Sequence, residues 1–265
     1  YSIIAYFLLG YEHYMIAIKT KDEIEIMAAA GRILSAVMQQ VANAAKEGVT
    51  LKELDLLALK LTRMAGGEPA FLGYQPHGAI APYPATICAS VNEIIVHGVP
   101  TKYKLRSGDL LKLDFGVKLN GYYADAALTV PIGVISKQAE LLIDTTRKAL
   151  LSGIKQMRIG NTLGDIGNAI EFIIKSRGFY VVEGLTGHGI GKELHEDPSV
   201  FNDGKPSSGP KLQEGMVLAI EPMVAIGTSK IIKLSDDSYA TFDGSLSAHF
   251  EHTVAVTKDG PVILT

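Results

Sequence analysis

The sequence predicts one mixed α/β domain built from two similar halves. In each half, helical periodicity comes first and short strand patterns follow it. The glycines that close the helical segments also repeat, since 112 residues separate Gly48 from Gly160 and Gly66 from Gly178. The composition, 47% hydrophobic and 20% charged, is that of a globular chain. We therefore expect a duplicated helix pair, each copy followed by strands.

The first half begins with two predicted helices. Apolar residues spaced by three and four over positions 24–45 form one helical face. Each helix starts with a Thr-x-x-Glu capping box, at Thr20 and at Thr50. Glycines are expected to end them, Gly48 the first and Gly66 the second.

The second half repeats this arrangement. An apolar face recurs from Leu142 to Met157, and a new helix is expected to start at Thr162 and to run to Gly178. The two repeats span roughly residues 20–130 and 136–257 of a single domain over residues 15–265.

Polar residues follow the strands of both halves in the same order. Each half has a His-x-x-Pro motif, then an apolar strand that reaches a carboxylate, then a second carboxylate before a further apolar stretch. The pairs are His97 with His195, Asp114 with Glu221, and Asp125 with Glu251. Each half therefore contributes one histidine and two carboxylates.

These four carboxylates indicate a metal site. Buried carboxylates need a partner, and no Lys or Arg stands at matching positions to provide one. Two divalent cations would balance their charge, and mixed oxygen and imidazole donors suit Mn, Fe, Co or Zn. His188, between Gly187 and Gly189, is the remaining ligand candidate. No cysteine occupies a candidate position, which argues against a structural zinc site.

Charge and cysteine content restrict the partners and the compartment. The net charge of −3, without long runs of one sign, gives no basic surface for nucleic acid or for an anionic membrane. Cys88 is the single cysteine, so a reducing, cytoplasmic setting is expected. Residues 1–14 are an N-terminal extension of unknown status, because their apolar run is too short to span a bilayer and lacks the features of a signal peptide.

Taken together, the ordered motifs resemble the type I methionine aminopeptidases, metallopeptidases of the pita-bread fold. The resemblance implies a curved antiparallel sheet backed by two helix pairs about a pseudo-twofold axis. The matching stretches are FLGY (71–74), CASVNEIIVHGVP (88–100), GDLLKLDFGV (108–117), GYYADAALT (121–129), GDIG (164–167), GHGIGKELHEDP (187–198), GMVLAIEPM (215–223) and DGSLSAHFEHTVAVT (243–257).

The resemblance also implies an activity and a set of site residues. The activity is removal of the N-terminal methionine from nascent proteins, preferably before a small second residue, by a water that bridges two metal ions. Glu221 would also move the proton of that water, and His97 and His195 would contact the substrate. The implied metal ligands are Asp114, Asp125, His188, Glu221 and Glu251. His249 could donate a hydrogen bond to a ligand carboxylate but is not in this set.

The methionine pocket is implied less directly. Tyr83, Cys88 and Leu194 would line it, with Tyr74 near its mouth. Two positions depart from the family pattern, because Leu194 stands where phenylalanine is common and the chain has no tryptophan. Tyr239 is our candidate replacement for the tryptophan at the pocket edge.

Two other functions use the same pattern. A proline-specific aminopeptidase or prolidase would share the five ligands, and an inactive protein of this fold would serve as a scaffold for nucleic acid or protein. The segment 88–100 matches the methionine-specific branch, and the complete ligand set disfavours the inactive scaffold. We expect a monomer that meets nascent chains, with transient proximity to the ribosome, and no membrane or nucleic-acid partner.

Overall fold

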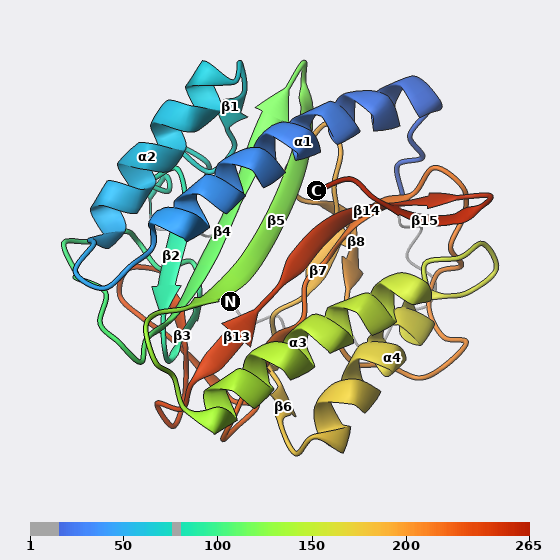
Figure 1. The fold of residues 1–265 in the computed structure, drawn as a ribbon. Coiled ribbons are helices and arrows are strands. Elements are labelled where there is room, and N and C mark those ends of the chain that lie inside the picture. The colour runs from blue at the N-terminus through green and yellow to red at the C-terminus, as the bar shows by residue number, and fades with distance from the viewer. Residues whose placement is uncertain (1–15, 76–80) are drawn as a thin grey trace.

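A curved antiparallel sheet with helices packed on one of its faces forms the centre of the molecule (Figure 1). The computed structural model describes residues 16–75 and 81–265. The predicted extension over residues 1–14 lies outside the described residues. No helix in the described ranges has both the length and the apolar character needed to cross a bilayer.

The helices form two pairs, as expected. They are α1 (Lys21–Ala44) with α2 (Leu51–Met64), and α3 (Lys137–Lys155) with α4 (Leu163–Ser176). Complete capping boxes start α1, α2 and α4, each from a threonine side chain that accepts the third residue's backbone N–H. The prediction that α1 continues to Gly48 is wrong, because the backbone leaves the helix at Ala45. Gly48, with φ of +87°, instead serves the turn before α2.

The strands are short, apart from three long ones in the main sheet. That sheet has nine strands, in the order β1-β4-β5-β14-β9-β7-β8, with β2 paired to β4 and β15 paired to β14. Their bounds are β1 Glu68–Pro69, β2 Cys88–Val91, β4 Leu110–Leu119, β5 Tyr122–Pro131, β7 Gly187–Gly189, β8 Glu196–Val200, β9 Val217–Ile220, β14 Glu251–Thr257 and β15 Gly260–Ile263.

Two three-stranded sheets flank the main one. The first has the order β13-β10-β6 and the second the order β11-β12-β3. Their bounds are β3 Ile94–Val96, β6 Tyr180–Val181, β10 Met223–Ala225, β11 Ile231–Lys233, β12 Tyr239–Thr241 and β13 Ser247–His249. All strand pairs among the described residues are antiparallel, so the predicted fold class is confirmed.

Each helix pair covers its own part of the sheet. The apolar side of α1, including Met27, Leu34 and Val41, packs on β4 and β5. The apolar side of α3, including Leu142 and Leu150, packs in a second cluster with α4 and β9. These two cores fill one face of the sheet, which leaves the opposite face free to carry polar side chains.

Candidate metal centre

Four neighbouring strands bring four acidic side chains to one face of the sheet. Asp114 on β4 and Glu251 on β14 both pair with Ala127 on β5, so they lie in one row and on one face. Asp125 is two residues before Ala127 and shares that face. Glu221 directly follows β9, whose last residue pairs with the residue after Glu251. The register of the sheet therefore gathers the four predicted carboxylates.

A cavity of about 1190 Å³ lies over these carboxylates. His188 reaches it from β7, where it pairs with Ala219 of β9, two residues before Glu221. Among the described residues that line the cavity there is no Lys or Arg. The lining includes all five predicted ligands, His97, His195, and the apolar or weakly polar side chains Phe71, Tyr74, Tyr83, Cys88, Val99, Leu194 and Met223.

Burial makes this group of acids unfavourable without a cation. Asp114, Asp125 and Glu251 are at most 8% exposed. Burial, followed by the charge of neighbouring carboxylates, raises the pKa of Asp114, Glu221 and Glu251 well above the usual range. Burial also raises the pKa of Asp125, to about 7, against a backbone hydrogen bond that opposes it.

The donor atoms also fit a metal. Asp114 Oδ1 and Glu251 Oε1 are buried and have no hydrogen-bond partner in the described part of the chain. Donor atoms of Asp125, His188 and Glu251 lie within 4.8 Å of one another. Carboxylate oxygens and imidazole nitrogens together suit a divalent transition metal or zinc. The residues present therefore fit a metal ion.

His188 is held in the tautomer that a metal ligand needs. Its Nδ1 is 2.8 Å from the carbonyl oxygen of Gly189, which only accepts, so Nδ1 carries the proton. The free Nε2 lies 3.5 Å from Glu221 Oε1. Burial lowers the pKa of His188 to about 4, so the imidazole is neutral near pH 7.

The two other predicted histidines stand beside this centre. The His195 ring lies 4.3 Å from the His188 ring, between centroids, and its Nδ1 is 2.7 Å from the Tyr74 hydroxyl. Burial first, then His188 and His97, lowers the pKa of His195 to about 3. Burial also lowers the pKa of His97, whose backbone has a left-handed φ of +62°.

The predicted pocket residues fall into two groups. Tyr74, Tyr83, Cys88 and Leu194 line the cavity, and the Tyr83 hydroxyl donates to the backbone of residues 87 and 98. Tyr239 is not among the lining residues. Its ring instead packs edge-on against His97, with 5.7 Å between centroids. The structure therefore places Tyr239 behind a histidine of the site rather than on the cavity wall.

Comparison with known proteins decides the family. Residues 25–258 match the metallopeptidase family M24. The chain belongs to this family. A methionine aminopeptidase of Clostridium acetobutylicum is 47% identical to this M24 chain over 253 residues, which are 95% of this chain and 99% of the relative. The resemblance inferred from the sequence, and the prediction of a hydrolase, are confirmed.

Solved structures agree with this family. A methionine aminopeptidase from Thermotoga maritima is 39% identical to the M24 chain, with a TM-score of 0.90 and coverage of 95% of this chain and 99% of that one. A prolidase from Pyrococcus furiosus is 25% identical, with a TM-score of 0.75 and coverage of 94% and 65%. The two share the fold, and the first is more similar to this chain in sequence.

Three residues that hold the centre of this M24 protein were not predicted. The Thr253 hydroxyl accepts the backbone N–H of Asp125 at 2.9 Å and donates to its carbonyl at 2.8 Å. Thr129 fixes the backbone of His249 in the same two-sided way. The Asn202 side chain donates to the carbonyl of Glu221 at 3.0 Å. A signal was present for Thr253, which lies two residues after Glu251 and so on the same strand face.

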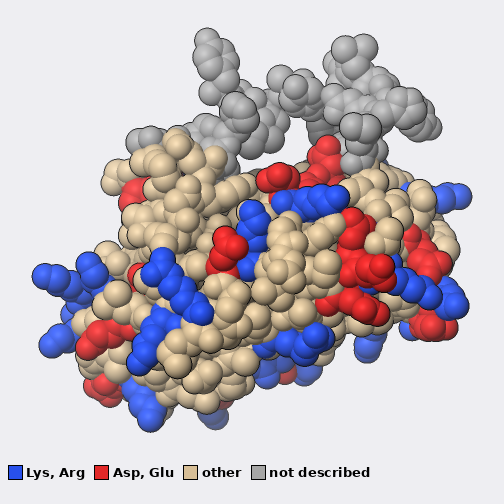
Figure 2. All heavy atoms as spheres, turned by 90° about the horizontal axis from the view of Figure 1, so that it is seen from above, with Lys and Arg blue, Asp and Glu red and all other residues tan. Residues whose placement is uncertain are grey.

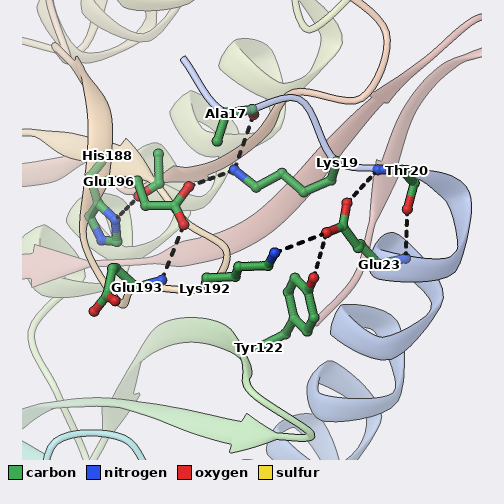
Figure 3. A network of polar contacts seen from close by, with 10 residues as sticks. Ala17, Lys19, Thr20, Glu23, Tyr122, His188, Lys192, Glu193 and Glu196 are labelled. Carbon is green, nitrogen blue, oxygen red and sulfur yellow. Dashed lines mark hydrogen bonds and ion pairs between the residues drawn. The ribbon is translucent and has the colours of Figure 1, made fainter. Parts of the chain in front are cut away.

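A further network ties the segment that carries His195 to the start of α1 (Figure 3). Lys19 Nζ lies 2.7 Å from Glu196 Oε2, and the Lys19 and Glu196 side chains are only 6% and 15% exposed. Glu196 directly follows His195 and also accepts the backbone N–H of Glu193. Gly191 leaves the room for this pair, since a Cβ there would lie 2.5 Å from Lys19 Cε and 2.7 Å from Glu196 Oε1.

Proposed function

We propose that this M24 chain is a methionine aminopeptidase, which removes the N-terminal methionine of nascent proteins and peptides, preferably when the second residue is small. The observation that carries the proposal is the convergence of the five predicted ligand side chains, from β4, β5, β7, β14 and the end of β9, on the lining of one cavity. The names of the relatives agree with it.

The metal centre would hold two divalent ions of Mn, Fe, Co or Zn. Asp114 would hold one ion and His188 with Glu221 the other, and Asp125 and Glu251 would contribute carboxylate oxygens to both. The support is the burial of the carboxylates and the lack of Lys or Arg among the described residues of the cavity wall. When bound, such ions lower the pKa of a water and polarise a carbonyl group.

The other residues would handle the proton and the developing charge. Glu221, at the cavity floor, accepts the proton of the attacking water and releases it to the leaving amine. His195 Nδ1 lies 2.7 Å from the Tyr74 hydroxyl; we assign the hydroxyl as donor in this contact, which puts the proton of the neutral ring on Nε2. Nε2–H is then the donor that stabilises the oxyanion. His97 assists at the scissile nitrogen.

The methionine side chain would occupy the apolar side of the cavity. Phe71, Tyr83, Cys88 and Leu194 are there, and Phe71 packs edge-on against Tyr83, with 6.4 Å between ring centroids. An unbranched thioether fits such a surface and makes favourable contacts with aromatic edges. Leu194 in place of a phenylalanine leaves the pocket fewer aromatic edges for the sulfur.

We further propose that the enzyme works as a monomer in the reducing cytoplasm, with transient proximity to the ribosome. Cys88, the single cysteine of the sequence, is buried and free, which suits that compartment. On the face shown in Figure 2, basic and acidic side chains are interspersed, so no nucleic-acid surface is evident there.

The test compares three tripeptides after reconstitution of the protein with Mn²⁺, Fe²⁺, Co²⁺ or Zn²⁺. We expect cleavage of Met-Ala-Ser, slower cleavage of Met-Leu-Ser, and no cleavage of Ala-Pro-Ala. Cleavage of Ala-Pro-Ala alone would favour the proline-specific enzyme. Failure to cleave any of the three peptides with any of the metals would favour the inactive scaffold.

A further inference from the structure

A second buried imidazole lies beside Glu221 and has no role in the chemistry above. His249 ends β13, two residues before Glu251, and is 1% exposed. Neither of its ring nitrogens has a hydrogen-bond partner in residues 16–75 and 81–265. A buried polar group left without a partner is destabilising, so this ring needs a partner outside the protein's own hydrogen bonds.

The backbone fixes where this ring lies. Thr129 Oγ1 accepts the backbone N–H of His249 at 3.0 Å and donates to its carbonyl oxygen at 2.8 Å. The strand also pairs with β10, where Met223 stands opposite His249. Since β5 and β10 both hold the residue, the ring is pre-positioned beside the carboxylates.

The distance to Glu221 suits a shared metal better than a direct hydrogen bond. His249 Nε2 lies 3.5 Å from Glu221 Oε2, whereas N–H···O hydrogen bonds in proteins span about 2.7–3.2 Å. Two donor atoms, each about 2.1 Å from a tetrahedral metal, are roughly 3.4 Å apart. The predicted ligand His188 faces the other oxygen of Glu221 at the same 3.5 Å.

A third donor completes the group. Three donor atoms lie within 4.8 Å of one another, one each from Glu221, His249 and Glu251. Glu251 Oε1 is buried and lacks a hydrogen-bond partner in the described chain, as the His249 ring does. Two unpartnered groups and a carboxylate oxygen therefore face one small space.

We propose that His249 is a sixth metal ligand, which coordinates a divalent ion together with Glu221 and Glu251. The inference rests on the metal centre proposed above and adds one imidazole to it. Imidazole suits Zn, Fe and Ni, whereas Mn prefers oxygen donors. His249 should therefore raise the affinity of the centre for Zn²⁺ and Co²⁺ more than for Mn²⁺.

The test is metal binding by His249→Gln. Glutamine can still hydrogen-bond to Glu221, so this variant removes the imidazole donor but keeps an orienting contact. The matched control is His252→Gln, because His252 lies on the next strand along the chain, β14, and its Nδ1 is instead 3.0 Å from Thr265 Oγ1. Circular dichroism and urea unfolding of the metal-free proteins check the fold of each variant.

Competition with a chelator measures the affinities for Co²⁺, Zn²⁺ and Mn²⁺, and the visible spectrum of bound Co²⁺ reports its ligands. We expect His249→Gln to weaken one Co²⁺ and one Zn²⁺ site by roughly 100-fold or more, to shift the Co²⁺ bands and to change Mn²⁺ affinity less. His252→Gln should match the wild type. Unchanged Co²⁺ affinity and spectrum in His249→Gln would overturn the inference.

Two further results keep the inference apart from the proposed function. A wild-type protein that binds no divalent ion would contradict the metal centre itself, and with it the sixth ligand. If His249→Gln does not fold, X-ray absorption spectroscopy of the wild-type protein loaded with two Zn²⁺ gives the number of imidazole ligands per zinc. About one imidazole per zinc supports His249 as a ligand, and about half an imidazole per zinc refutes it.

Discussion

Loss of the Lys19 ammonium is expected to lower the free energy of unfolding by about 3 kcal/mol. The Lys19→Met variant removes the partner of Glu196 at 2.7 Å, where the two side chains are only 6% and 15% exposed. A buried pair that loses one member typically loses about 3–5 kcal/mol. We expect the lower end of this range, because Glu196 keeps the backbone N–H of Glu193 as a donor and reaches the open cavity.

Urea unfolding of the metal-free proteins measures this effect as a shift in the midpoint urea concentration, with no change in the dependence of the unfolding free energy on urea. Lys19→Met, Glu196→Gln and the double variant form a cycle, and the double variant should lose clearly less than the sum of the single changes. The control is Lys148→Met, which breaks the Lys148–Asp144 pair on α3, 54% and 48% exposed, and should change stability by less than about 0.5 kcal/mol. Equal effects of Lys19→Met and Lys148→Met would refute the reasoning.

Three further changes test the centre and its surroundings. Glu251→Ala should bind fewer than two divalent ions per chain by elemental analysis, and full loading with full turnover would contradict its bridging role. Tyr74→Phe removes the hydroxyl at His195 Nδ1 and should lower kcat roughly 10-fold with little change in KM; a change confined to KM would argue against it. Hydrogen bonds from Tyr122 and then Thr20 lower the pKa of Glu23 from 4.5 to about 2, a contribution to stability present above pH 4.5 and lost as the pH falls toward 2. Tyr122→Phe should therefore lower stability at pH 7, and its difference from wild type in thermal unfolding should shrink between pH 4.5 and 2.

The parts of the fold that depend on neighbouring residues could be predicted from sequence. The predicted capping boxes at Thr20 and Thr50 involve residues three apart, and both are present. The helix expected to start at Thr162 also begins there, and the structure adds a capping box with Asp165. The last residue of α1 could not be predicted from Gly48. The helix ends at Ala44, and Gly48 adopts its positive φ in the turn that follows. A glycine therefore predicts that a turn follows the helix more reliably than it predicts which residue is the last of the helix.

The site shows the same division. A single sequence is enough to recognise carboxylates within apolar strands as candidate site residues, and in the structure Asp114, Asp125 and Glu251 lie on one face of the sheet. The support for Asp125 from Thr253 depends on how β5 and β14 pair, across 128 residues of chain. The position of Tyr239 behind His97 likewise depends on the pairing of β12 with β3. Such contacts follow from register, which periodicity alone does not specify.

The place of β14 in the sheet affects how the protein folds as it is synthesised. This strand is the last but one along the chain, yet it lies between β5 and β9 at the middle of the sheet. Until β14 leaves the ribosome, β5 and β9 each present an unpaired edge. More than a hundred further residues must be synthesised after Asp114 and Asp125 before Glu251 joins them. Contacts of such long sequence separation slow folding. We therefore expect the nascent chain to pass through a stage with open strand edges and no complete centre, the kind of intermediate that exposes a protein to aggregation.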